Sequence, residues 1–134
     1  MESYKLELAG CTVNVRLQNG VYKIKCESAI GKTRLCKLLK RKSTYIADGE
    51  TGQKEVGFTY ADYTSGTKLK LDGIKLAILD RYDLYRHDKE ITEEIERHRN
   101  DCIILLDAKE QAYGPVLPNG RARLKMTINE IEVY

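Results

Sequence analysis

The sequence predicts an α/β domain with a largely parallel central sheet and an N-terminal antiparallel hairpin. Alternating apolar and polar residues on both sides of Asn19-Gly20 indicate the hairpin. Two continuous apolar runs, Leu76–Leu79 and Cys102–Leu106, are typical of strands that are buried on both faces, as in parallel sheets. A helical pattern beginning at Asp88 lies between these runs. Strands that alternate with helices favour a parallel sheet.

The first quarter of the chain is predicted to form three strands. Tyr4–Leu8 alternates with period two until Gly10, and Thr12–Leu17 alternates again. Asn19-Gly20 is the strongest short hairpin signal in a sequence. It predicts that Thr12–Leu17 turns back to pair with Val21–Lys25.

Later segments alternate between helix, turn and strand patterns. Apolar residues at helical spacing predict a helix over Arg34–Lys42, and Ser43–Gly52 is rich in turn residues. Asp88 can cap a helix that runs to about Asn100. The remaining predictions are a strand over Val56–Tyr63, a loop from Tyr113 to Gly120, and closing β structure over Leu124–Val133 with a turn at Asn129-Glu130.

Composition predicts one globular domain over residues 1–134, in the cytoplasm and without membrane association. The net charge of +3 does not by itself indicate a nucleic-acid partner. No apolar run approaches the length of a membrane helix, and the N-terminus lacks a secretory signal pattern. The four cysteines show no close pairing, and His87 and His98 are the only histidines. We therefore expect reduced thiols, with neither a disulfide framework nor a zinc site.

The segment from Cys26 to Thr33 has the context of a phosphate-binding loop. It follows the predicted strand Val21–Lys25, ends in Gly31-Lys32-Thr33 and precedes a predicted helix. Backbone N–H groups at a helix start point at a bound anion, and the helix dipole favours negative charge there. A lysine in this position reaches the outer phosphates, and a threonine hydroxyl can ligate Mg²⁺. The predicted nucleotide-binding residues are Ser28, Ala29, Ile30, Gly31, Lys32 and Thr33.

On these motifs the chain resembles a reduced P-loop nucleoside triphosphatase, and its N-terminal hairpin is similar to that of ABC-type ATPases. The resemblance implies that Ile24–Thr33 is the Walker A region and that Leu76–Asp80 is the Walker B strand with its aspartate. It further implies that ATP or GTP binds with Mg²⁺, and that Thr33 and Asp80 hold the metal. Asp107, after the run Cys102–Leu106, would stand where these families often place a polar sensor. In open α/β sheets, ligands bind beyond the carboxyl ends of the strands, so Asp80 and Asp107 are expected beside the loop.

Several departures from the family pattern favour nucleotide binding over rapid hydrolysis. Cys26 replaces the first glycine of the GxxxxGK(S/T) motif. Arg81 stands where ABC-type enzymes have the glutamate that positions the attacking water, and Asp83 and Glu110 are the nearest substitutes. The chain has no Leu-Ser-Gly-Gly signature. We therefore expect weak or partner-dependent hydrolysis.

Two alternatives from other functional classes stay open at this point. One is a non-catalytic interaction protein on a degenerate P-loop scaffold that binds a protein or a nucleic acid. Basic residues between Arg34 and Lys42 are its candidate patch, although a solvated helix face explains them as well. The other is a small-molecule phosphotransferase with an acceptor site near Tyr60, Asp62 and Tyr63. Fold class alone does not separate these functions.

Overall fold

The computed structural model describes residues 3–8, 11–26, 44–49, 52–61, 69–79, 81–108, 113–127 and 130–134. Within this part of the chain, β strands outnumber helices, and the only regular helices are one α-helix and one short 3₁₀ helix. No helix among these residues combines the length and the apolar character that crossing a membrane requires. The strands are β1 (Ser3–Leu8), β2 (Cys11–Arg16), β3 (Gly20–Cys26), β4 (Thr44–Gly49), β5 (Gly52–Ala61), β6 (Ile74–Leu79), β7 (Ile103–Leu106), β8 (Gly120–Met126) and β9 (Glu130–Val133).

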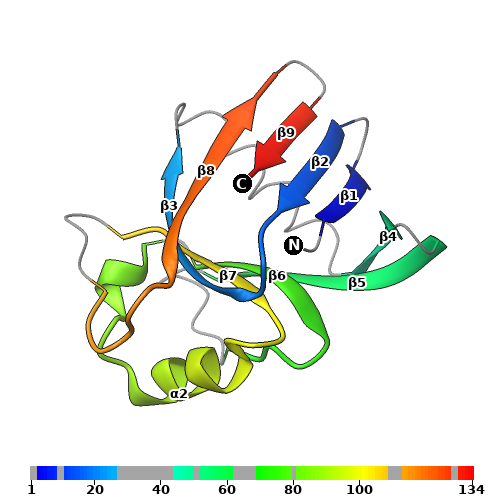
Figure 1. Ribbon diagram of the computed structural model, residues 1–134. Helices are drawn as coiled ribbons and strands as arrows, with labels where there is room; N and C mark the ends of the chain where they lie inside the picture. Colours follow the sequence, from blue (N-terminus) through cyan, green and yellow to red (C-terminus); the bar gives the residue numbers. More distant parts are fainter. Residues whose placement is uncertain are drawn as a thin grey trace.

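All these strands belong to one mixed sheet that closes on itself. The order of neighbours is β1-β2-β9-β8-β3-β7-β6-β5-β4, and β4 pairs with β1 to complete the ring. The run β8-β3-β7-β6-β5 is parallel throughout, whereas β1–β2, β4–β5 and β8–β9 are antiparallel pairs. Figure 1 shows that the sheet bends, so that β8, β9 and β2 stand at an angle to β7, β6 and β5. The prediction of a mostly parallel sheet is therefore confirmed, whereas the sheet is mixed and closed and the helix content of the described residues is low.

The two apolar runs form the centre of the parallel part, as predicted. Leu76–Leu79 lies in β6 and Ile103–Leu106 forms β7, and every residue in both runs is at most 2% exposed. The register pairs Leu76 with Ile103 and Leu79 with Leu106, so the two strands end at the same level. Burial on both faces explains why these segments are continuously apolar instead of alternating.

Helix α2 (Lys89–His98) connects β6 to β7 and covers one face of these strands (Figure 1). Asp88 caps it as predicted, because its side-chain oxygen accepts a hydrogen bond from the Ile91 backbone N–H at 3.0 Å. Ile95 is fully buried in a cluster with Ala77, Leu79, Ile104 and Leu106. The short 3₁₀ helix η2 (Tyr82–Leu84) precedes α2 and buries Tyr82 in the same cluster. The strand–helix–strand alternation is therefore seen directly between β6 and β7.

The predicted hairpin at Asn19-Gly20 is wrong. β2 pairs with β1 and β9, whereas β3 pairs with β7 and β8, so the strands on the two sides of this dipeptide are not partners. The backbone of β3 finds its partners elsewhere. Gly20 N–H donates to the Cys102 carbonyl at 3.0 Å, Val21 N–H donates to the Asn119 side-chain oxygen at 2.8 Å, and Asn119 N–H donates to the Val21 carbonyl. Two parallel neighbours thus take both edges of β3, and the N-terminal antiparallel pair is β1–β2 instead.

The turn predicted over Ser43–Gly52 is also wrong for most of its length. Thr44–Gly49 forms β4, which pairs with β5 from Thr44 opposite Gly57 to Gly49 opposite Gly52. β4 therefore has backbone partners on both edges, β5 on one edge and β1 on the other.

Candidate functional site

The carboxyl ends of three adjacent parallel strands meet at one edge of the sheet. β7 lies between β3 and β6, and Leu106 pairs with Lys23 on one side and with Leu79 on the other. β3 continues beyond this level to Cys26, where it pairs with Leu124 of β8. β6 and β7 therefore end at the same level, whereas β3 extends three residues beyond it in the same direction.

Asp107 joins the ends of β6 and β7 through its backbone. Its N–H donates to the Leu79 carbonyl at 3.0 Å, and its carbonyl accepts from the Tyr82 N–H at 2.7 Å. These bonds attach the chain after β7 to residues on both sides of position 80. Asp107 is partly buried, at the edge where the sequence predicted a polar side chain.

Arg81, which lies between β6 and η2, has an unusual backbone conformation. Its φ of 52° and ψ of 41° lie in the left-handed region, which residues with a Cβ adopt at an energetic cost. It is the residue that precedes η2, and its side chain is exposed. The residue at which a water-orienting carboxylate was expected from the sequence is therefore an exposed cation. Asp83, one of the suggested substitutes, lies within η2 and is partly buried.

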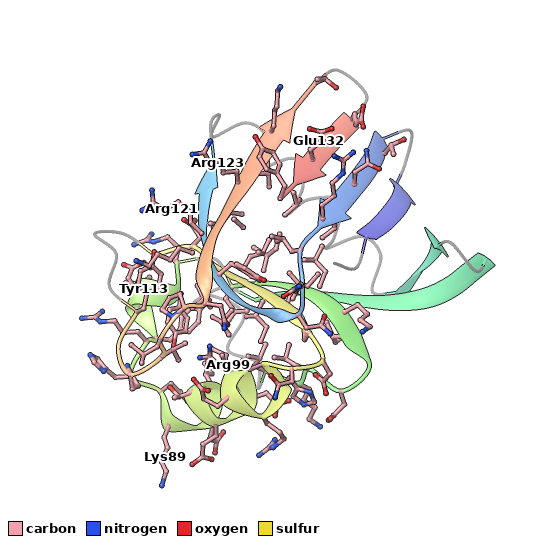
Figure 2. The ribbon with its side chains drawn as sticks, in the orientation of Figure 1. Lys89, Arg99, Tyr113, Arg121, Arg123 and Glu132 are labelled. Carbon is pink, nitrogen blue, oxygen red and sulfur yellow. The ribbon has the colours of Figure 1, made fainter. Side chains whose placement is uncertain are left out.

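A second group of side chains, which the sequence did not indicate, lies near Asp107. The Lys23 ammonium lies 5.3 Å from the centre of the Tyr113 ring, a cation–π distance. Arg121 is the strand neighbour of Lys23, and Figure 2 shows Tyr113 and Arg121 on the same side of the molecule. Burial raises the pKa of Tyr113, the Arg121 guanidinium opposes this rise, and the Asp107 carboxylate adds to it. Basic and aromatic groups therefore accompany the carboxylate near this edge.

Sequence reasoning missed this group because its members are distant along the chain. Period-two alternation places Lys23 on the same face of β3 as the buried Val21, and that was the only local signal. Tyr113 and Arg121 come from the loop after β7 and from β8, and only the pairing of β8 with β3 brings them together. Such a pairing leaves no trace in local spacing.

Most of the predicted phosphate site lies outside the described residues. This holds for all six loop residues and for Asp80, so of the two predicted metal ligands, Thr33 and Asp80, neither is described. It holds equally for the helix predicted over Arg34–Lys42, and for Asp62, Tyr63 and Glu110. Tyr60 lies in β5 opposite Ile78 of β6, close to the end of that strand. The loop residues that lie outside the described part are Ser28, Ala29, Ile30, Gly31, Lys32 and Thr33.

Two comparisons with known proteins find no relative. A scan against protein-family models finds no match, and a search of curated proteins finds none either. A functional proposal for this chain must therefore rest on its residues and on their geometry.

Proposed function

We propose that the chain binds a nucleoside triphosphate, ATP or GTP, with Mg²⁺ at the edge where β3, β6 and β7 end. The observation that supports this proposal is the parallel order β3-β7-β6, which directs the carboxyl ends of all three strands towards the same edge of the sheet. Gly31-Lys32-Thr33 follows one of these strands, and Asp80 follows another. Phosphate and magnesium ligands that start from adjacent strand ends can act on one bound nucleotide.

Each residue has a distinct role in this proposal. Backbone N–H groups over Ser28–Thr33 bind phosphate oxygens. The Lys32 ammonium neutralises the phosphate charge that uncharged backbone donors cannot neutralise. The Thr33 hydroxyl and the Asp80 carboxylate hold Mg²⁺, directly or through water. Asp107 is the polar residue that directly follows the intervening strand β7, and its backbone forms hydrogen bonds with Leu79 and Tyr82, which stand on either side of position 80 in the sequence.

Hydrolysis by the isolated chain is proposed to be slow. Phosphoryl transfer needs an oriented water or acceptor together with stabilisation of the transferred group. Arg81 is a cation that cannot accept a proton from water, and it stands at the position of the expected carboxylate. The same observation favours the second candidate function, in which the nucleotide site is a binding device and a partner protein or nucleic acid is the target. A partner could also supply a missing catalytic group in trans.

The binding test is a calorimetric titration of the purified chain with ATP and with GTP, each with and without Mg²⁺. Asp80→Asn should weaken Mg-ATP binding more than metal-free ATP binding, because the carboxylate acts through the metal. Glu90→Gln removes an exposed carboxylate from α2 and serves as the matched control. Equal effects of Asp80→Asn in both conditions would make Asp80 a structural residue at the end of its strand.

Turnover is tested by steady-state phosphate release over a range of protein concentrations. We expect release to be slow or undetectable at every concentration unless self-association supplies a catalytic group. Rapid release that is first order in protein and is lost in Lys32→Ala would make the chain a self-sufficient NTPase, contrary to the proposal.

A further inference from the structure

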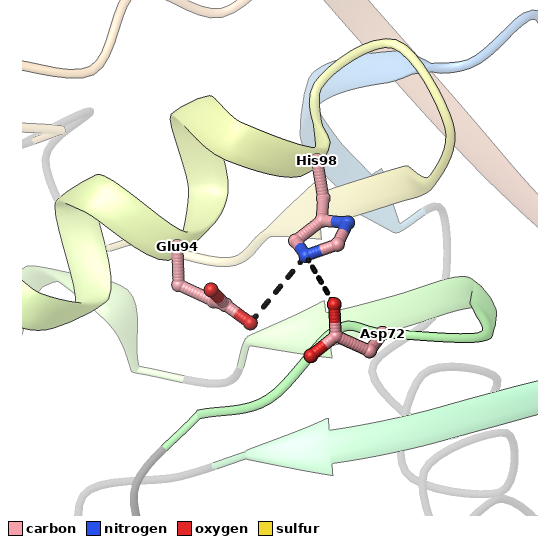
Figure 3. Close-up of side chains that lie close together, drawn as sticks. All are labelled: Asp72, Glu94 and His98. Carbon is pink, nitrogen blue, oxygen red and sulfur yellow. Dashed lines mark ion pairs between the residues drawn. The ribbon is translucent and has the colours of Figure 1, made fainter.

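Three side chains with metal-binding atoms converge at the opposite edge of the parallel strands. Glu94 and His98 lie one turn apart on α2, and Asp72 lies in the turn that leads into β6 (Figure 3). The His98 Nε2 atom is 3.2 Å from Asp72 Oδ1 and 3.6 Å from Glu94 Oε2. Because Asp72 precedes β6, this cluster is at the amino end of the strand, away from the proposed nucleotide site.

His98 is buried, and one of its ring nitrogens lacks a hydrogen-bond partner. The residue is 7% exposed. Its Nδ1 lies 2.9 Å from Asp101 Oδ1, and a carboxylate oxygen accepts, so Nδ1 carries the proton in the neutral ring. Nε2 is then an acceptor, and it has no hydrogen-bond partner within the described residues. The atoms facing it are carboxylate oxygens, which are acceptors as well (Figure 3). A cation between these atoms would satisfy all of them.

Glu94 is held in place for such a role. Its side chain is 8% exposed. Oε2 accepts a hydrogen bond from the Leu71 N–H at 2.8 Å, and Oε1 pairs with the Arg97 guanidinium. A carboxylate oxygen has a further lone pair after one hydrogen bond, so Oε2 can still bind a metal. A buried carboxylate that is held by a backbone donor and by an ion pair loses little freedom when it does so.

Asp72 supplies an open side to the cluster. Its side chain is 83% exposed, so an ion can enter from solvent. The turn that carries it is closed by the Ile74 N–H, which donates to the Leu71 carbonyl at 3.1 Å, and Gly73 takes a φ of 74°. Gly73 suits this backbone because it has no Cβ. The turn thus presents Asp72 next to the residue whose N–H binds Glu94.

We propose that Asp72, Glu94 and His98 form a binding site for a divalent transition-metal ion, with zinc as the best match. Zinc is bound in proteins by imidazole nitrogen and carboxylate oxygen, and a water can complete four ligands. Tetrahedral bonds of about 2.0–2.1 Å place neighbouring ligand atoms about 3.3 Å apart. The separations of 3.2 and 3.6 Å around His98 Nε2 bracket that value.

The outer contacts of the cluster support the same assignment. Metal-bound histidines commonly donate their other ring N–H to a carboxylate, which fixes the ring and raises the basicity of the ligand nitrogen. Asp101 occupies that position for His98. The bound ion would tie α2 to the turn before β6, and because the site needs the folded chain, zinc would stabilise the fold. The spacing of cysteines and histidines could not indicate this site, since Asp72 reaches it only through tertiary structure.

The test is zinc binding to the metal-stripped full chain in competition with a chromophoric chelator. Wild type should bind one zinc ion at this site, and zinc should raise its melting temperature. Asp72→Asn keeps the size of an exposed side chain but removes the charged ligand, so it should fold normally and bind zinc at least about tenfold more weakly. Glu93→Gln removes a half-exposed carboxylate on the same helix outside the cluster and should bind like wild type.

Three outcomes would overturn the proposal. The first is that wild type does not bind zinc. The second is that Asp72→Asn binds zinc as tightly as Glu93→Gln, which would place the ion elsewhere, for example on cysteine thiolates. The third is that zinc leaves the His98 ring resonances unshifted in NMR spectra. Zinc-dependent shifts of those resonances in wild type, reduced in Asp72→Asn at equal zinc, would support the site.

Discussion

Among single described residues, Arg81 has the backbone conformation with the clearest energetic cost. It adopts the left-handed region without being glycine. Arg81→Gly should therefore raise the free energy of unfolding by about 0.5 kcal/mol, because the relieved strain exceeds the extra chain entropy of glycine. Arg81→Val should lower it by about 1 kcal/mol or more, because a β-branched residue fits this region poorly. Urea unfolding measures both.

A matched control for this prediction is Arg123→Gly. Arg123 is exposed and lies within β8. Glycine in an extended strand should lower the free energy of unfolding by about 0.5–1 kcal/mol. If Arg81→Gly destabilises the chain as much as Arg123→Gly does, the left-handed conformation at position 81 is not a source of strain.

The sequence located individual residues where a local rule applies and missed them where contacts are distant. Asp107 was expected at the end of a buried strand, and it is found there. The contact of Lys23 with Tyr113, and the approach of Asp72 to His98, depend on strand order and on the packing of α2. Neither contact has a signature in residue spacing. The loop Ser28–Thr33 and Asp80 stay predictions, because they lie outside the described residues.

Among the elements, α2 shows how a short helix depends on its first turn. Asp88 accepts from the Ile91 N–H, and the Thr92 hydroxyl donates to the Asp88 carbonyl at 2.8 Å. Asp88→Ala leaves an orphan N–H and should lower the free energy of unfolding by about 1 kcal/mol. Asp88→Ser, which can still cap, should cost less. Urea unfolding of both variants tests this, and equal losses would show that the cap contributes nothing specific.

Elements were predicted well where burial determines the pattern of apolar residues, and poorly where a strand can pair with alternative partners. The runs in β6 and β7 are apolar because both faces are covered, so their sequence alone identified them. Asn19-Gly20 favours a hairpin locally, yet β3 pairs with β7 and β8, and these parallel ladders outweigh one turn preference. Thr44–Gly49 reads as a turn, but the antiparallel pairing with β5 makes it a strand. Choice of partner is a tertiary property that no local window contains.

At the scale of the whole molecule, the buried thiol of Cys102 couples stability to pH. Burial raises the pKa of Cys102 from 9.0 to about 12, the Asp101 carboxylate adds to the rise, and Lys75 opposes it. The folded chain therefore holds this proton where the unfolded chain has lost it. The stabilisation is complete below pH 9 and is lost as pH rises from 9 towards 12.

We expect the free energy of unfolding to fall above pH 9 by up to about 1.4 kcal/mol per pH unit from this group. Burial also raises the pKa values of Tyr82 and Tyr113, which adds loss of the same sign at higher pH. Urea unfolding between pH 7 and 10.5 measures the slope. Cys102→Ala should show a shallower decline than wild type, and an identical slope in both would contradict the assignment to this thiol.

The whole-molecule proposal is that adjacent strand ends assemble one site for a magnesium nucleotide. Its most direct test is calorimetric titration of wild type and Lys32→Ala with Mg-ATP and Mg-GTP. Lys89→Ala, which removes an exposed lysine from α2, is the control. The proposal predicts that wild type and Lys89→Ala bind at least one of these nucleotides, whereas Lys32→Ala folds normally and loses binding. Absence of binding in wild type, or unchanged affinity in Lys32→Ala, would contradict it.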